Sequence, residues 1–348
     1  MGTMPQLVCG VDTHADLHCA AAVDGNGQVL ATASFAATID GFGAMFDWLA
    51  GHGQVSVVGV EGTSSYGKGL TGFLRRNGIE VVEVIRPNRQ TRRLNGKSDP
   101  ADAIAAARAV LSGEASGIPK TGEGPVEAIR ALRIARSSAL KARTQASNQI
   151  RDLIRTGPDD LRDKLHPLTT SQRVEACARL RITDRHTTTE VACRTALRLL
   201  ARRHQALSKE IKELTSRLVE LVQTTAPTLC ALKGVGPDVA AKLLIAAGDN
   251  PERMRNEAAF AALCGASPLD ASSGKQQRHR LNRGGDRQAN NALWTIAMVR
   301  MSTDPKTRHY AERRTKEGLT KGEILRCLKR YIARETHHAI QQDLTHLT

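Results

Sequence analysis

Short apolar runs separated by turns dominate the first 111 residues. The runs at 7–11, 18–23 and 29–35 predict three strands, and the Asp24-Gly25-Asn26-Gly27 stretch between the last two favours a tight turn. The expected elements that follow are a helix at 41–50, a strand at 55–60, a helix at 66–76, a strand at 80–85 and an alanine-rich helix at 103–111. Three strands in a meander, followed by alternating helices and strands, are typical of a mixed α/β sheet with helices on its faces.

The middle of the chain has the periodicity of long helices. Residues 125–155 predict an arginine-rich helix, whereas 156–190, with its proline-containing turns, predict a linker or loop. A further helix is predicted from apolar residues at alternating three- and four-residue spacing. One position of this seam is a histidine, His204, which we interpret as a residue that sets the register of the packing. The residues of the seam are Leu197, Leu200, His204, Leu207, Ile211, Leu214, Leu218 and Leu221. Such a seam is typical of a coiled coil, used for self-association or for packing on the 125–155 helix.

The last third of the chain is predicted to be mostly helical. Lys233, Gly234 and Gly236 fit the turn of a helix-hairpin-helix, whose bare backbone N–H groups bind DNA phosphate without reading sequence. The same residues also fit a glycine cap followed by a proline that starts the next helix. Further helices are predicted at 258–263, 287–301 and 322–340. The predicted domains are 1–115, 116–225 and 226–348.

Charge is distributed unevenly along the chain. The 348 residues, 41% of them hydrophobic, are enough for two or three domains with real cores. The formal net charge is +15, yet residues 1–85 hold three basic and eight acidic side chains, so the remainder carries +20. An acidic first domain on a strongly basic body indicates a metal-holding catalytic module joined to a module that binds a polyanion. Aromatic residues make up only 3%, which argues against a wide base-stacking surface.

Cysteine usage and hydropathy bear on the cellular compartment. The seven cysteines show neither a CxxC pair nor a Cys/His ligand spacing, which predicts reduced core residues instead of a disulfide framework or a zinc site. The N-terminus lacks a basic-then-apolar signal, and no apolar run reaches the length of about 18 residues that a membrane span needs. We therefore expect a cytoplasmic protein with no membrane partner.

Four carboxylates fall where a metal site is expected. Asp12 and Glu61 each end a buried apolar strand, where a charge is costly unless it is compensated. Asp99 and Asp102 stand three residues apart at a helix start, so their side chains face the same side. Together the four can hold two Mg²⁺ ions about 4 Å apart. Each also has an ordinary role, as a strand-end turn residue, an N-cap or a helix-dipole partner. Their combination in this order favours the metal site.

The composition of residues 264–291 does not fit a buried strand or helix. A Gly/Ala/Ser/Pro turn leads to Ser272 and Ser273, then to a basic cluster, and then to Asp286, the predicted N-cap of the next helix. Because arginine and lysine bind phosphate strongly, the stretch fits a serine presented to a phosphodiester. It also fits a flexible basic loop that touches nucleic acid without doing chemistry. With the hairpin turn, the residues expected to bind nucleic acid are Lys233, Gly234, Gly236, Lys275, Arg278, Arg280 and Arg283.

These motifs together resemble the insertion sequence 110 transposases, which are bridge-RNA-guided recombinases. The resemblance rests on GVD ending in Asp12, E-G-T-S-S-Y from Glu61, K-S-D-P-A-D-A with Asp99 and Asp102, the KGVG hairpin, and A-S-S-G-K with H-R-L-N-R-G-G-D. It covers nearly the whole chain. It implies an N-terminal DEDD domain, and the predicted element order matches the ribonuclease H-like (RuvC-like) fold. A helical segment would join this domain to a transposase domain with a catalytic serine.

The family implies Mg²⁺-dependent DNA strand exchange, in which the serine attacks the phosphodiester and holds one DNA end covalently. It implies a structured guide RNA, and a homo-oligomer in which the DEDD residues of one subunit meet the serine of another. Ser273, directly followed by Gly274, is the expected nucleophile, with Ser272 as its rival. Two alternatives stay open: a structure-specific endonuclease, similar to Holliday-junction resolvases, that uses water, and a non-catalytic nucleic-acid-binding protein.

Overall fold

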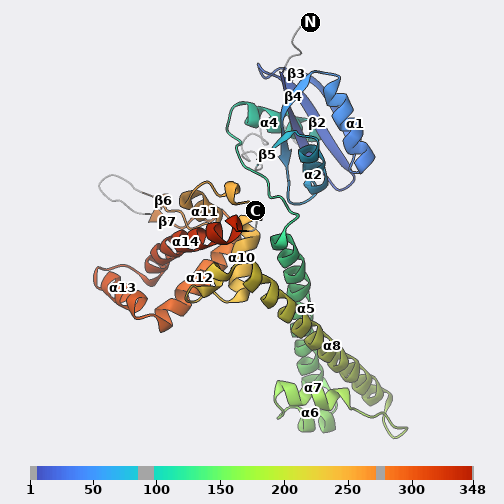
Figure 1. Cartoon of the computed structure of the whole chain (residues 1–348). Helices are drawn as coiled ribbons and strands as arrows, with labels where there is room; N and C mark the ends of the chain where they lie inside the picture. Colours follow the sequence, from blue (N-terminus) through green and yellow to red (C-terminus); the bar gives the residue numbers. More distant parts are fainter. Residues whose placement is uncertain (1–5, 85–97, 272–278, 347–348) are drawn as a thin grey trace. The chain divides into compact units, whose positions relative to one another are not determined.

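The computed structural model describes residues 6–84, 98–271 and 279–346, which form two compact units. The first comprises Met1–Gly124 with Ala247–Ala262, and the second Pro125–Ala246 with Leu263–Thr348. A five-stranded sheet lies in the first unit, and the second is mostly helical (Figure 1). The predicted mixed α/β class with a helical remainder is confirmed, while the domain boundaries at 115 and 225 stay a prediction.

The sheet of the first unit has the strand order β3-β2-β1-β4-β5. β1 (Gln6–Thr13), β2 (Leu17–Asp24) and β3 (Val29–Ala36) form an antiparallel meander. β4 (Gln54–Glu61) runs parallel to β1, and β5 (Glu80–Val84) runs parallel to β4. The register pairs Val11 with Val60, so the residues that come next, Asp12 and Glu61, reach the same edge of the sheet.

Side-chain alternation along the strands creates a core on each face of the sheet. Helices α1 (Ile39–Ala50) and α2 (Lys68–Arg76) contribute to the core that contains Val11 of β1. The other face is covered by α4 (Asp99–Leu111), which packs along β1, β2 and β4. The apolar cluster on this face contains Val8 of β1 and Ala107 of α4. β1 and β2 are therefore covered on both faces, whereas residues of β3 alternate between half-buried and exposed.

Gly10 sets how closely α4 approaches the sheet. A Cβ atom at this position would lie 2.1 Å from the carbonyl oxygen of Ala103 and 2.2 Å from the backbone nitrogen of Ala107. Both are backbone atoms of α4, so no side-chain rotation can relieve the contact. Only glycine permits this distance between helix and strand. The contact thereby fixes where the first turn of α4 lies over the sheet.

In the second unit, α5 (Pro125–Thr156) and α8 (Thr188–Thr225) pack side by side as a long pair, the α5–α8 hairpin (Figure 1). Leu197 of the predicted seam is fully buried in one cluster with Ile150 and Ile154 of α5. The seam therefore packs on the first long helix within one chain, which is one of the two uses predicted for it.

The prediction of a linker or loop at 156–190 is wrong. The segment contains α6 (Asp159–Leu165) and α7 (Thr170–Ala178), whose apolar side chains complete the cluster of the α5–α8 hairpin. The turn between them is closed by Arg173, which donates hydrogen bonds to the carbonyl oxygens of Leu165, His166 and Leu168. The prediction failed because the prolines at 158 and 167 indicate turns, and because helices as short as α6 and α7 carry too few apolar positions to show a helical period.

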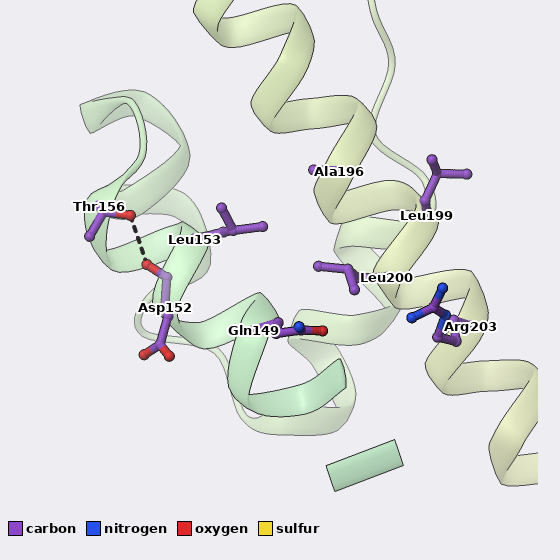
Figure 2. A pocket seen from close by; sticks show the side chains of 8 residues that line it. All are labelled: Gln149, Asp152, Leu153, Thr156, Ala196, Leu199, Leu200 and Arg203. Carbon is purple, nitrogen blue, oxygen red and sulfur yellow. Dashed lines mark hydrogen bonds between the residues drawn. The ribbon is translucent and has the colours of Figure 1, made fainter. Parts of the chain in front are cut away.

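A groove of about 580 Å³ runs between α5 and α8. Figure 2 shows Leu153 of α5 and Leu199 and Leu200 of α8 among its lining side chains, with Arg203 farther along α8. Leu199 is 59% exposed. Part of the apolar surface of the hairpin is therefore left exposed to solvent within one chain.

The rest of the second unit is a helical assembly around α14 (Lys321–Thr345). The buried carboxylate of Asp343 accepts hydrogen bonds from the backbone N–H groups of Thr228 and Leu229, which ties α14 to the start of α9 (Pro227–Ala231). Asp286 caps α12 (Arg287–Thr303), as predicted, by accepting from two backbone N–H groups of its first turn. The other elements of this unit are α10 (Pro237–Ala247), β6 (Leu269–Asp270), β7 (His279–Arg280) and α13 (Pro305–Lys316), whereas η1 (Pro251–Arg253) and nearly all of α11 (Glu257–Leu263) belong to the first unit. Among the described residues, every helix is too short or too polar to span a bilayer.

The contact at Gly10 yields a direct test of the packing. We expect Gly10→Ala to destabilise the full chain by about 1–3 kcal/mol, because the added methyl overpacks the interface between β1 and α4. Gly43→Ala is the matched control, since a Cβ atom there meets nothing within 4 Å and alanine favours a helix over glycine. Urea denaturation should show a lower midpoint only for Gly10→Ala. Equal midpoints for the two variants would contradict the close packing of α4.

Candidate active site

A tight turn after β4 fixes the end of that strand beside the end of β1. The hydroxyl of Thr13 donates a hydrogen bond of 2.7 Å to the carbonyl oxygen of Glu61. Gly62 follows with a positive φ of 73°, and its carbonyl oxygen accepts from the backbone N–H groups of Ser65 and Gly67. The E-G-T-S-S-Y-G segment thus folds back at once, and the hydrogen bond from Thr13 joins the two strand ends.

The same turn is held to β5 by side chains. The hydroxyl of Thr63, which is buried, donates to Glu83 at 2.8 Å. The other carboxylate oxygen of Glu83 lies 3.2 Å from Nη2 of Arg253, in the segment that returns to the first unit late in the sequence. Arg253 also donates to the carbonyl oxygen of Ala247. The edge that carries Asp12 and Glu61 is therefore tied down along three strands.

The first turn of α4 brings two more carboxylates to the site. Ser98, not Asp99, is the N-cap residue, and Asp99 is the first residue of the helix with Pro100 next to it. The N-cap role considered for Asp99 is therefore not the one it has. Asp102 lies one turn further on and is 6% exposed. The first turn of α4 therefore holds two carboxylates, one of which is buried.

The structure brings Asp12, His14 and Asp99 into one cluster. A ligand atom from each of the three lies within 4.8 Å of the others. Nε2 of His14 is 3.2 Å from Oδ2 of Asp12 and 3.3 Å from Oδ1 of Asp99. His14 was missed by the sequence interpretation. The available signal was its position two residues after Asp12, in the turn that directly follows β1.

The electrostatics of Asp12 link it to all the predicted carboxylates. Burial raises the pKa of Asp12 above its usual range, and the nearby charges of Glu61, Asp102 and Asp99 raise it further. His14 opposes this effect by favouring the ionised form. Glu61 and Asp102 are close enough to act on Asp12 through their charge, but their oxygens are not part of the 4.8 Å cluster.

The side chains fit a divalent cation. Oδ2 of Asp12 is buried and has no hydrogen-bond partner, since its approach to His14 lacks hydrogen-bond geometry. Carboxylate oxygens that repel one another, with one of them buried and unsatisfied, are relieved when a hard cation binds between them. Asp12 and Asp99 would supply such oxygens directly, with the imidazole of His14 between them. The arrangement therefore suits metal-assisted chemistry on a phosphate ester.

Part of the predicted basic loop lies outside the described residues. This holds for Ser272, Ser273, Lys275 and Arg278. On either side of this segment, β6 and β7 pair in antiparallel fashion, with Asp270 opposite His279. Nδ1 of His279 is 3.1 Å from Oδ1 of Asp270. Arg280 and Arg283 are exposed.

The predicted hairpin turn at Lys233 packs on the junction of α12 and α13. Gly234 has a φ of 86°, which explains why a glycine is needed there. The ammonium of Lys233 donates to the carbonyl oxygen of Thr303 at 3.0 Å, and Arg300 donates to the carbonyl oxygen of Lys233 at 2.7 Å. A Cβ atom at Gly236 would meet nothing within 4 Å. Phosphate binding by this turn stays a prediction.

Comparisons with known proteins agree with this layout. Residues 9–156, which include the carboxylate cluster, match a family model for DEDD transposases of the IS110 type, and residues 226–312 match a model for transposases of the IS116/IS110/IS902 family. A Streptomyces coelicolor protein named for the mini-circle transposase of IS117 is 24% identical over 96% of this chain and 94% of its own length. A 43.6 kDa protein of insertion element IS110, from the same organism, is 34% identical over 30% of this chain and 26% of its own length. With both parts of the chain matched in order, the protein belongs to the IS110 family of transposases, which are enzymes that act on DNA.

Proposed function

We propose that this transposase cleaves and exchanges DNA strands through a Mg²⁺-dependent carboxylate site and a serine nucleophile, Ser273, under the guidance of a structured RNA. One observation carries the proposal: the approach of Asp12, His14 and Asp99 to within 4.8 Å, at the edge of the sheet where β1 and β4 end. The strand order, with an antiparallel meander continued by two parallel strands, supports a ribonuclease H-like fold for this unit. Support for RNA and DNA partners comes from the +20 charge beyond residue 85.

In the proposed site, Asp12, Asp99, Glu61 and Asp102 would hold divalent cations. When bound, these cations would supply charge neutralisation and polarisation to the scissile phosphate. The residues themselves keep their carboxylates at a fixed place, because β1 and α4 approach closely at Gly10 and the hydroxyl of Thr13 joins β1 to β4. Nε2 of His14 lies 3.2 Å from a carboxylate oxygen of Asp12 and 3.3 Å from one of Asp99, so the imidazole stands between the two proposed ligands.

The proposed covalent step belongs to the basic loop. The hydroxyl oxygen of Ser273 bonds to phosphorus, the bond from phosphorus to the 3′ oxygen of the DNA breaks, and the departing oxygen gains a proton from solvent. His279 is the proposed acceptor of the serine proton, because the carboxylate of Asp270 lies beside its Nδ1 and leaves Nε2 to act as the base. Arg280 and Arg283, with Lys275 and Arg278, would neutralise the phosphate.

A covalent protein–DNA adduct tests the serine directly. Wild type, Ser272→Ala and Ser273→Ala are incubated with Mg²⁺, the guide RNA and end-labelled DNA, denatured in detergent and separated by size. We expect label on wild type and on Ser272→Ala, and a loss of at least about a hundredfold for Ser273→Ala, because only the attacking oxygen is removed. All three proteins should bind DNA equally, which serves as the control for folding.

Cleavage by Ser273→Ala at the wild-type rate, with no adduct in any variant, would show that water is the nucleophile. The resolvase-like alternative would then hold. Adduct formation by Ser273→Ala but not by Ser272→Ala would move the assignment to Ser272. In both cases the choice of Ser273 would be wrong.

We also propose that the protein is a homo-oligomer that associates through the α5–α8 hairpin. The support is the groove of about 580 Å³, whose lining includes Leu153, Leu199 and Leu200 (Figure 2), together with the 59% exposure of Leu199. Because the predicted seam is already used inside the chain, the remaining apolar surface of α8 is the part available to a second copy.

Leu199→Asp tests this association without touching the core. An aspartate on the exposed face should raise the dissociation constant of the oligomer by about tenfold or more, since a charge would be buried in an apolar contact. Ile39→Asp, at an exposed site on α1, is the control. Sedimentation velocity on the full chain, with and without nucleic acid, gives the masses. A monomeric wild type under both conditions would refute the association, and an unchanged Leu199→Asp oligomer would refute this interface.

A further inference from the structure

A second hollow, of about 590 Å³, lies in the C-terminal part and is not part of the carboxylate site. Its lining comes from residues 265–268, from residues 279–282, from the turn between α13 and α14, and from one face of α14. Glu323, Arg326 and Arg330 are separated by three, four and seven positions on α14, so they project from the same side of the helix. We call this hollow the α14 pocket.

The α14 pocket has an excess of positive charge. Arg326 lies 3.8 Å from Glu323, which is the only carboxylate in the described lining. Arg314 forms an ion pair with Glu317, next to the pocket. The cationic side chains of the lining are Arg280, Arg314, Arg326, Lys329 and Arg330. Five cations around one carboxylate select for an anionic ligand.

A buried lysine lies among these lining cations. Lys329 is 6% exposed, and its ammonium donates a hydrogen bond of 3.0 Å to Oδ1 of Asn290. Asn290 in turn donates to the carbonyl oxygens of Cys264 and Gly265, which holds the amide in place. Within the described part of the chain, no carboxylate pairs with Lys329. Burial, and then the charge of Arg326, lower the pKa of Lys329. A buried ammonium with a neutral partner is stabilised when an anion binds beside it.

Aromatic and apolar side chains stand at the same pocket. Tyr331 is 55% exposed and Leu281 is 50% exposed, and both line it. The ring of Tyr331 meets the ring of Tyr310 edge-on, with centroids 5.9 Å apart and planes at 88°, so the face of Tyr331 is held in a defined orientation. An exposed aromatic face next to arginines is the pairing that single-strand binders use for a base and its phosphate.

We propose that the α14 pocket binds one nucleotide of a single nucleic-acid strand, with the phosphate at Arg326, Lys329 and Arg330 and the base on Tyr331. Its volume is in the range of pockets that hold a ligand of this size. The inference rests on the proposed function, because it takes a nucleic acid as the partner. It adds a binding site on α14 to the predicted basic loop. DNA and RNA strands share this chemistry, and the test separates them.

Fluorescence anisotropy with labelled dT12 and rU12 on the full chain tests the α14 pocket. We expect Arg330→Ala, Lys329→Met and Tyr331→Ala each to weaken binding by about fivefold to a hundredfold, as loss of a phosphate contact or a stacked base does. For Arg330→Ala and Lys329→Met, the slope of log affinity against log salt should also fall by about 0.7, whereas Tyr331→Ala should keep the slope. Arg308→Ala, exposed on α13 and outside the lining, is the control and should bind like wild type.

The outcomes separate the pocket from the proposed function. If wild type binds neither strand, the proposed function itself fails. If wild type binds and the three pocket variants match Arg308→Ala in affinity and slope, the α14 pocket is not a binding site, while the proposed function stands. Weakening with only one of the two strands supports the proposal and identifies that strand as the ligand. Circular dichroism checks folding, and Arg330→Ala and Tyr331→Ala keep the test decisive if the buried Lys329→Met unfolds.

Discussion

The close contact between α4 and β1 at Gly10 is the constraint on which the candidate site depends. A Cβ atom at Gly10 would come within 2.1 Å of an α4 backbone atom, so helix and strand meet at a distance that no other residue permits. This contact sets the first turn of α4 over the edge where β1 and β4 end. Asp99 thereby reaches Asp12 and His14. The site is a consequence of how a helix packs on a sheet.

That packing has an electrostatic cost. Asp12 is 6% exposed, and its burial together with three neighbouring carboxylates raises its pKa. His14 offsets part of the repulsion, but Oδ2 of Asp12 is left buried without a hydrogen bond. A buried carboxylate next to other carboxylates is tolerated when a bound ligand compensates its charge. Carboxylates with shifted pKa values are frequent in catalytic sites. A bound cation would offset the electrostatic cost of the carboxylate cluster.

Most of the first unit could be predicted from the sequence, because apolar runs that end in a lone carboxylate leave few alternatives. Asp12 and Glu61 were predicted in this way, and Asp99 and Asp102 were predicted from their three-residue spacing at a helix start. His14 was not, since one histidine in a strand-end turn has no distinctive spacing until α4 places Asp99 beside it. The helices at 159–178 were missed because their stability comes from packing on the α5–α8 hairpin. The α14 pocket joins parts of the chain that are far apart in sequence, so the basic residues of 322–340 predicted only a charged helix.

Metal binding by the carboxylate cluster is the most direct test of this account. Isothermal titration of the full chain with Mn²⁺, as a substitute for Mg²⁺, is compared for wild type, Asp12→Asn and the exposed control Asp47→Asn, with thermal melting in parallel. We predict that wild type and Asp47→Asn bind Mn²⁺ and melt at a higher temperature with it. Asp12→Asn should lose binding by tenfold or more and melt above metal-free wild type, because a buried charge is gone. Equal Mn²⁺ binding by Asp12→Asn and wild type, or no binding by wild type, would contradict the metal site.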